Sequence, residues 1–417
     1  MAELRSWLKT AELYFKSVFR WLLIAVITGV ICGLIGSAFH LIVSHATGIR
    51  EKSPWLLYLL PLGGLFIAGL YKLTKTEGEG TNNIIASIHE GERIPAALVP
   101  VIFVATALTH LFGGSAGREG AALQIGGGIG YGIGRMARLD EKDMRIVTLC
   151  GMSAVFAALF GTPLTATVFA LEVISVGILH YAGFLPCLLA STVAYGISRL
   201  IGIEPMRFAI AVQHLDVLML LRVCILGVVC ALVSILFCVV MHKTEHILSD
   251  KLKNSYLRAF LGGAVIIALT LLVGTRDYNG IGTAVIERAL SGEAIPGWAF
   301  FWKMLFTAVT IGAGFKGGEI VPTFFVGAAL GAVVAPLIDM PSAFGAALGL
   351  VAVFCGAVNC PLASIILSVE LFGSGELIYF ALACGISYML SGYFGLYSRQ
   401  KIMYSKVKAE FINRYAR

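Results

Sequence analysis

Long apolar segments without charge constrain this chain more than any other feature of its sequence. Residues 21–42, 55–73 and 217–241 are nearly free of charged side chains, and a helix crosses the bilayer core in ~20 residues. Of the 417 residues, 58% are hydrophobic and 13% are charged, a composition that would aggregate in water. Lipid requires backbone groups to be paired within the structure, and the short alternating segments of a β-barrel are absent. The sequence therefore predicts an all-α polytopic membrane protein.

Basic residues gather near both ends of the chain. They are Arg5, Lys9, Lys16 and Arg20 at one end, and Arg399, Lys401, Lys406, Lys408, Arg414 and Arg417 at the other. By the positive-inside rule, we expect both termini in the cytoplasm. The formal net charge of +7 then indicates contact with anionic membrane lipids and not with nucleic acid. The nine cysteines lack zinc or redox spacing, so neither a metal nor a cofactor is expected.

Short motifs recur in the same order in the two halves of the chain. Residues 91–95 (GERIP) return at 292–296 (GEAIP), and 125–130 align with 326–331 at the same offset of 201. A further match relates residues 162–172 to 360–370, at an offset of 198.

We expect a single transport domain built from two copies, from about 20 to 205 and from about 215 to 400, followed by a basic cytoplasmic tail at 398–417. Transporters are often built from such copies, frequently inverted, with the substrate where the copies meet.

Six ionisable residues lie at apolar depth, where a charge needs a partner or a function. They are Arg118, Glu119, Glu172, Lys316, Glu319 and Glu370. Glu172 and Glu370 occupy matching positions late in apolar helices, and we expect them to be structural carboxylates with hydrogen-bonded partners. For Arg118 and Lys316, ion pairing at a helix start and a direct substrate role stay equally open.

A glycine-flanked turn precedes an apolar helix in each half. The first is Gly117-Arg118-Glu119-Gly120, inside a segment (112–135) with ten glycines and three charges that predicts a broken, buried helix. The second is residues 317–322, where Glu319 precedes Ile320-Val321-Pro322. Free amides at such helix starts attract anions. Glu119 is then either a simple helix cap or a gate whose carboxylate competes with an anion for those amides.

These motifs resemble the CLC family of chloride channels and proton-coupled anion antiporters over nearly the whole chain. The 117–120 motif is similar to the family's gating-glutamate signature, and residues 317–322 resemble its second anion-binding helix start. Tyr397 matches the tyrosine that closes the inner end of the pathway. The resemblance implies an inverted repeat of broken and tilted helices, a homodimer with one pathway per subunit, and a bacterial plasma membrane location.

Departures from the chloride members resemble the fluoride branch of the family, CLC-F. Gly80-Thr81-Asn82 stands in place of the family's serine motif, and Val173 occupies the position of the inner proton glutamate. In that branch, the Thr81 position is more often methionine or asparagine. The branch implies that Glu119 and Glu319 carry the proton. It implies an anion path lined by Gly80, Thr81, Asn82, Gly117, Arg118, Gly120, Ile320, Val321 and Tyr397.

Three functions remain open at this point. The first is export of fluoride against inward protons, and the second is chloride/proton exchange or chloride conduction in the same fold. The third is a membrane enzyme that uses Glu119 and Glu319 as a carboxylate pair. The third lacks support because the sequence contains no His-Glu-x-x-His motif or paired-aspartate motif.

Overall fold

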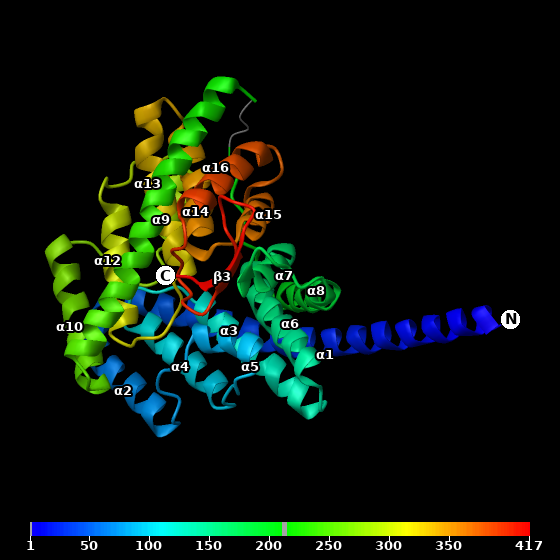
Figure 1. Cartoon of the computed structure of the whole chain (residues 1–417). Coiled ribbons are helices and arrows are strands. Elements are labelled where there is room, and N and C mark those ends of the chain that lie inside the picture. Colours follow the sequence, from blue (N-terminus) through cyan, green and yellow to red (C-terminus); the bar gives the residue numbers. More distant parts are fainter. Residues whose placement is uncertain (1, 211–214) are drawn as a thin grey trace.

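The computed structural model describes residues 2–210 and 215–417, which form α-helices and one small sheet (Figure 1). The first half contains α1 (Ala2–Lys52), α2 (Leu60–Leu73), α3 (Thr81–Glu90), α4 (Leu98–Leu111), α5 (Glu119–Met136), α6 (Glu141–Phe160), α7 (Pro163–Glu172) and α8 (Phe184–Leu200). The second half contains α9 (Val217–Lys251), α10 (Ser255–Val273), α11 (Thr283–Leu290), α12 (Ala299–Gly312), α13 (Ile320–Val334), α14 (Ser342–Val358), α15 (Pro361–Phe372) and α16 (Leu377–Leu390). Short 3-10 turns are Pro54–Leu59, Tyr181–Gly183 and Ala335–Ile338.

Seven helical stretches in the described residues are long and apolar enough to cross a membrane. The predicted apolar segments 21–42, 55–73 and 217–241 lie within three of them. The predicted multi-pass helical protein is therefore confirmed. The segment 112–135 is also broken as predicted, because α4 ends at Leu111 and α5 begins only at Glu119.

Helix α1 is longer than the apolar segment predicted for it. It is continuous over 51 residues, and its N-terminal part projects away from the rest of the molecule (Figure 1). Its apolar part packs on α8 at Gly29 and Gly33, where an added Cβ would lie 2.7 Å from Ala190 O and 2.9 Å from Ala194 Cα. Small residues of this kind let membrane helices approach closely. The side chains of Arg5 and Lys9 lie outside the described part of the structure.

The same close packing recurs at matched places in the two halves. Gly126 of α5 lies directly against the backbone of Gly151 in α6, with no room for a Cβ. Gly327 of α13 lies against Gly349 of α14 in the same way. Because two backbones meet at each contact, larger side chains would force the helices apart. These helix pairs form the buried centre of the fold.

Aromatic rings fill the space between the halves. Phe160 of α6 meets Phe324 of α13 with ring centroids 6.4 Å apart, and Phe324 contacts Phe354 of α14 at 5.1 Å. Phe354 in turn lies 5.9 Å from Phe169 of α7. These contacts join α6, α7, α13 and α14 in one core, and aromatic pairs add to the stability gained from buried area.

The chain after α16 folds back as two strands instead of extending as a tail. Strand β2 (Lys401–Tyr404) pairs in parallel with β1 (Ser175–Val176) and antiparallel with β3 (Phe411–Tyr415). Ile402 is fully buried against Val176, which explains why this stretch folds despite its basic side chains. The predicted basic tail at 398–417 is thus an ordered element that contacts the first half of the chain.

Candidate functional site

The two predicted glycine turns meet in the middle of the molecule. Gly117 N donates to Gly318 O at 2.7 Å, and Gly318 N donates to Gly117 O at 2.8 Å. A Cβ at Gly318 would collide with the backbone nitrogen of Gly120, so the approach requires glycine. The backbone bridge places the starts of α5 and α13 side by side. Each helix start leaves amide groups without intrahelical partners.

Glu119 is the first residue of α5, and its side chain is completely buried. Its Oε2 atom accepts a hydrogen bond from Val321 N, in the first turn of α13, at 3.3 Å. The backbone N–H groups of Arg118 and Glu119 also face this carboxylate. Oε1 has no hydrogen-bond partner among the described residues. One oxygen of Glu119 therefore bonds to the start of α13, while the other has no described hydrogen-bond partner, which is costly at a buried site.

Arg118 points away from this junction. Its Nη1 donates to Ser44 Oγ of α1 at 3.3 Å, and its side chain is buried. Arg118 lies close enough to Glu119 for their charges to interact. It therefore contributes a positive potential beside the helix starts, and its guanidinium is engaged with α1.

A cavity of about 260 Å³ brings most of the remaining predicted residues together; we name it the Glu319 cavity. Its polar lining includes Gly80, Thr81, Asn82, Gln124, His242, Glu245, Arg258, Lys316, Glu319 and Tyr397. Glu319 is the N-cap residue of α13, and its charge interacts with those of Glu119, Glu245 and Lys316. Gly117, Arg118, Gly120, Ile320 and Val321 are absent from the lining, so the structure separates the helix starts from the cavity beside them.

Thr81 joins α3 to α5 at the cavity wall. Its hydroxyl donates to Gly120 O at 3.3 Å and accepts from Gln124 Nε2 at 3.3 Å. Both bonds tie Thr81 to protein groups. Gln124 was not singled out from the sequence, although it is the one polar side chain in the run Ala121–Ile125 (AALQI). Its Oε1 is buried without a described partner, so an amide group faces the cavity from α5.

Asn82 and Tyr397 face the same cavity from two distant parts of the chain. Asn82 Oδ1 accepts a hydrogen bond from Arg399 N at 3.2 Å. This bond fixes the orientation of the Asn82 amide, so Nδ2 remains available as a donor. The Tyr397 hydroxyl is buried and has no described partner. Because a buried hydroxyl normally finds a partner, these two side chains provide unused donors at one place.

A network at the C-terminal strands fixes Tyr397. Gln400 N donates to Tyr397 O at 3.0 Å, while Gln400 Nε2 donates to Val173 O and Val358 O, each at 2.9 Å. Asn359 Nδ2 donates to Gln400 Oε1 at 2.9 Å. This network ties the segment that carries Tyr397 to both halves.

Lys406, in the loop between β2 and β3, extends that network. Its Nζ donates to Asn359 Oδ1, to Ser391 Oγ at 2.9 Å and to Tyr388 O at 3.0 Å. Burial lowers the pKa of this ammonium to about 8. Three acceptors satisfy its three donors, so the charged form is well accommodated despite the burial.

Lys316 closes the cavity on the side of α2. Its Nζ lies 4.4 Å from the centre of the Tyr71 ring and donates to Glu79 O at 3.4 Å. In the loop before α3, burial raises the pKa of Glu79, Glu92 adds to the rise, and Lys316 opposes it. The structure thus places the Lys316 cation against an aromatic face and a carbonyl oxygen. This arrangement is neither an ion pair at the helix start nor a contact with substrate, so both alternatives for Lys316 stay open.

Glu172 and Glu370 each cap the start of a helix in the other half of the chain. Glu172 accepts from Leu362 N at 3.2 Å and Ala363 N at 2.9 Å, at the start of α15. Glu370 accepts from the backbone nitrogens of residues 164 and 165, at the start of α7, at 3.1 and 2.8 Å. The structure thus gives both carboxylates the hydrogen-bonded partners predicted for them. A carboxylate at a helix start is a favourable arrangement.

The sequence of the chain matches the family model for voltage-gated chloride channels over residues 63–392. A chloride/fluoride channel protein from Pseudomonas syringae pv. tomato is 37% identical over 396 residues, covering 93% of this chain and 87% of that protein. An uncharacterized protein from Methanocaldococcus jannaschii is 24% identical over 387 residues, covering 91% of this chain and 94% of that protein.

Solved structures share the fold. A CLC-type fluoride/proton antiporter matches with a TM-score of 0.89 and 33% identity, covering 92% of this chain and 98% of that one. A slow cyanobacterial chloride/proton antiporter matches with a TM-score of 0.74 and 21% identity, covering 89% and 94%. The second likeness shows the fold alone. Together with the helix bounds, these matches confirm the predicted inverted repeat of broken and tilted helices.

Proposed function

Because the chain belongs to the voltage-gated chloride channel family, known as CLC, we propose that it exports fluoride in exchange for protons. Members of this family are ion transporters and channels. The observation that carries the proposal is the contact between the Glu119 carboxylate and Val321 N, 3.3 Å apart, across the junction of the two helix starts. An anion and this carboxylate compete for the same amides.

In this mechanism, Glu119 alternates between two partners. The charged carboxylate occupies the amides at the starts of α5 and α13, as in the structure. Protonation removes the charge that those amides attract, so the side chain releases them to a fluoride ion. The anion and the proton then use one place in turn, which couples their movements without a large rearrangement of the fold.

Glu319 is proposed as the second proton carrier. The position after Glu172 is Val173, which cannot hold a proton, so another carboxylate is required. Glu319 lines the cavity beside the junction and interacts electrostatically with Glu119. A proton that leaves Glu119 therefore has an acceptor on the way into the Glu319 cavity.

Fluoride selectivity is proposed from the available donors. Fluoride is small and holds its water tightly, so several donors must replace that water. Asn82 Nδ2 and the Tyr397 hydroxyl face the cavity, and the Ile320 and Val321 amides begin α13. Two relatives support the choice of ion, since a protein 37% identical is named a chloride/fluoride channel protein and one 33% identical a fluoride/proton antiporter.

The remaining features of the proposal concern assembly and orientation. We infer a homodimer with one pathway per subunit in a bacterial plasma membrane, built from the two copies at about 20–205 and 215–400. Both termini face the cytoplasm, consistent with the basic residues at each end. Lys16 and Arg20 of α1 are exposed, as contact with anionic lipid head groups requires.

A flux assay tests the selectivity directly. Purified protein in liposomes loaded with equal fluoride and chloride should release fluoride much faster than chloride, as measured with ion-selective electrodes. Equal rates, or faster chloride release, would replace this proposal with chloride/proton exchange or chloride conduction in the same fold. Liposomes without protein give the background leak.

A further inference from the structure

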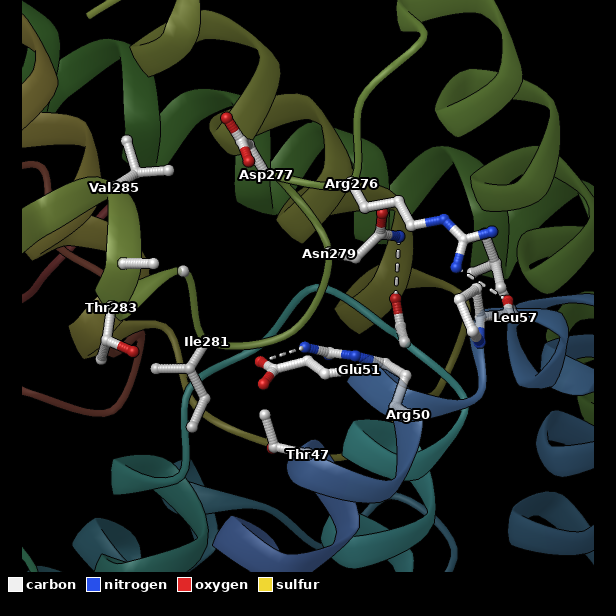
Figure 2. A pocket seen from close by; sticks show the side chains of 14 residues that line it. Thr47, Arg50, Glu51, Leu57, Arg276, Asp277, Asn279, Ile281, Thr283 and Val285 are labelled. Atoms are coloured by element: carbon white, nitrogen blue, oxygen red, sulfur yellow. Dashed lines mark hydrogen bonds and ion pairs between the residues drawn. The ribbon is translucent and has the colours of Figure 1, made fainter. Parts of the chain in front are cut away.

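A second cavity lies at the C-terminal end of α1 and contains about 300 Å³; we name it the Arg50 cavity. Figure 2 shows Thr47, Arg50 and Glu51 on one side, opposite the segment that runs from Arg276 to Val285. The Arg50 and Glu319 cavities have no lining residue in common. The Arg50 cavity is therefore distinct from the Glu319 cavity.

Two guanidinium groups line the Arg50 cavity. Arg50 is mostly buried, with 14% of its side chain exposed, and its Nη1 has no described hydrogen-bond partner. Arg276 Nη1 donates a hydrogen bond to Pro54 O at 2.9 Å (Figure 2). The other two guanidinium nitrogens of Arg276 take no part in that bond. A guanidinium carries five donors in a planar fork that suits anions, so this site has more donors than the protein uses.

The neighbouring carboxylates only partly offset these charges. Asp277 pairs with Arg288 at 2.7 Å, so its charge is already compensated. Glu51 lies 3.6 Å from Arg50 and is 68% exposed, and exposed pairs of this kind are weak. Helix α11 also begins at this wall, and its first turn contains no acidic residue. The cavity therefore keeps a positive potential.

A buried lysine links this cavity to the helix junction. Lys303 of α12 is fully buried and donates to Gly280 O at 2.7 Å and to Tyr278 O at 3.3 Å, behind the loop that forms the cavity wall. The Arg50 guanidinium lies against the other side of this loop, where it would collide with a Cβ at Gly280. Lys303 interacts electrostatically with both Arg50 and Glu119. Positive groups therefore extend from the cavity toward the gate.

We propose that the Arg50 cavity is a second anion site, in which Arg50 and Arg276 hold a small monovalent anion on its way between Glu119 and the adjoining solution. Its role as a station in transport rests on the proposed function. The binding itself does not, because it depends only on the guanidinium groups and the shape of the cavity. Lys303 and the start of α11 add to the potential that draws the anion in.

Bromide provides a direct test of binding, because its position is visible by anomalous X-ray scattering. Crystals of the full chain soaked in bromide should show an anomalous peak between the Arg50 and Arg276 guanidinium groups. Crystals of Arg50→Gln should lose that peak. An empty cavity in wild-type crystals, or a peak of equal height in the variant, would overturn the proposal.

Transport measurements test the role of the site. Arg50→Gln should raise the fluoride concentration for half-maximal transport by about tenfold, since one charge-assisted contact is lost. The number of protons moved per fluoride should stay unchanged. Arg50→Lys, which keeps the charge, should recover most of the loss.

Arg222→Gln is the matched control, because Arg222 pairs with the exposed Asp339 at 3.5 Å and lies outside the lining of the cavity. It should behave as wild type. An equal loss in Arg222→Gln would overturn the station role by assigning the effect to general surface charge. If wild-type protein moves no fluoride with a proton gradient, the proposed function fails, while the bromide result still decides whether the site binds anions.

Discussion

Helices α5 and α13 begin with the same glycine turn, joined by one backbone bridge, yet their carboxylates have different surroundings. Glu119 is the first residue of α5 and contacts Val321 N across the junction. Glu319 is one position earlier, as the N-cap of α13, and faces the Glu319 cavity. Successive helical residues point about 100° apart, so a shift of one residue turns one carboxylate onto the amides and the other toward the Glu319 cavity. In the proposed function, the same glycine turn therefore supports a gate at α5 and a proton carrier at α13.

The largest difference between the two helix starts should appear when each glycine of the bridge is changed. Gly318→Ala places a Cβ against the backbone nitrogen of Gly120, which cannot move alone, whereas Gly117→Ala meets the flexible end of Glu119. We expect Gly318→Ala to destabilise the protein by about 3 kcal/mol. Gly117→Ala should fold but lose coupling, because it displaces the gate. Thermal unfolding and coupled flux measure the two effects, and equal stability of the two variants would contradict this asymmetry.

The next largest effect is expected at Glu319, the proposed second proton carrier. Glu319→Gln replaces a carboxylate that can take up and release a proton with an amide that does not ionise, so proton flux should fall by about a hundredfold. Glu79→Gln is the control, because Glu79 lines the same cavity from a loop and its side chain is given no role in the proton path. Proton uptake into liposomes, followed with a pH-sensitive dye, gives the comparison. Normal proton-driven fluoride transport by Glu319→Gln would show that Glu319 is only a helix cap.

A smaller effect is expected at Tyr397. Tyr397→Phe removes a buried hydroxyl without a described partner and should weaken fluoride binding by about tenfold, as for one lost bond to an ion. Tyr393→Phe serves as the control, because its hydroxyl is 3.1 Å from Ser405 Oγ at the C-terminal strands. Calorimetric titration with fluoride measures both. Unchanged affinity and coupling in Tyr397→Phe would reduce this residue to a packing aromatic.

The smallest effect is expected at Thr81, whose hydroxyl connects α3 to α5 by hydrogen bonds. Thr81→Ala removes the bonds to Gly120 O and Gln124 Nε2 and should cost about 1 kcal/mol of stability. Thr81→Ser keeps the hydroxyl and should retain most of it. Selectivity between fluoride and chloride should stay the same in both variants, because the hydroxyl is already engaged. A marked change in selectivity would assign Thr81 a direct role at the anion.

The two helix starts also show which features of the molecule could be predicted from the sequence. The spans followed from apolar runs, and the turns at Gly117 and Gly318 followed from glycines beside charges in an apolar setting. The sequence could not show that Glu119 bonds to Val321, because the two residues are 202 positions apart and the contact depends on how the halves meet.

Other contacts were missed for the same reason. Gln124 and Lys303 each stand alone in apolar runs, and only the fold shows that one faces a cavity and the other lies behind the Arg50 loop. The C-terminal strands were also missed, because the many basic side chains of this stretch are typical of a solvated tail. Ile402 alone does not give a recognisable strand pattern. Their pairing with β1 depends on a strand of two residues, too short to be recognised by periodicity.

The central claim is that Glu119 is shared by the anion and the proton. The most direct measurement is fluoride movement against its own gradient, driven by an imposed pH difference across liposomes, in wild type and in Glu119→Gln. The amide resembles a protonated carboxyl group but cannot exchange a proton. The account predicts uphill fluoride accumulation by wild type and none by the variant, whether or not a passive leak remains. Uphill accumulation by Glu119→Gln at the wild-type rate would contradict it.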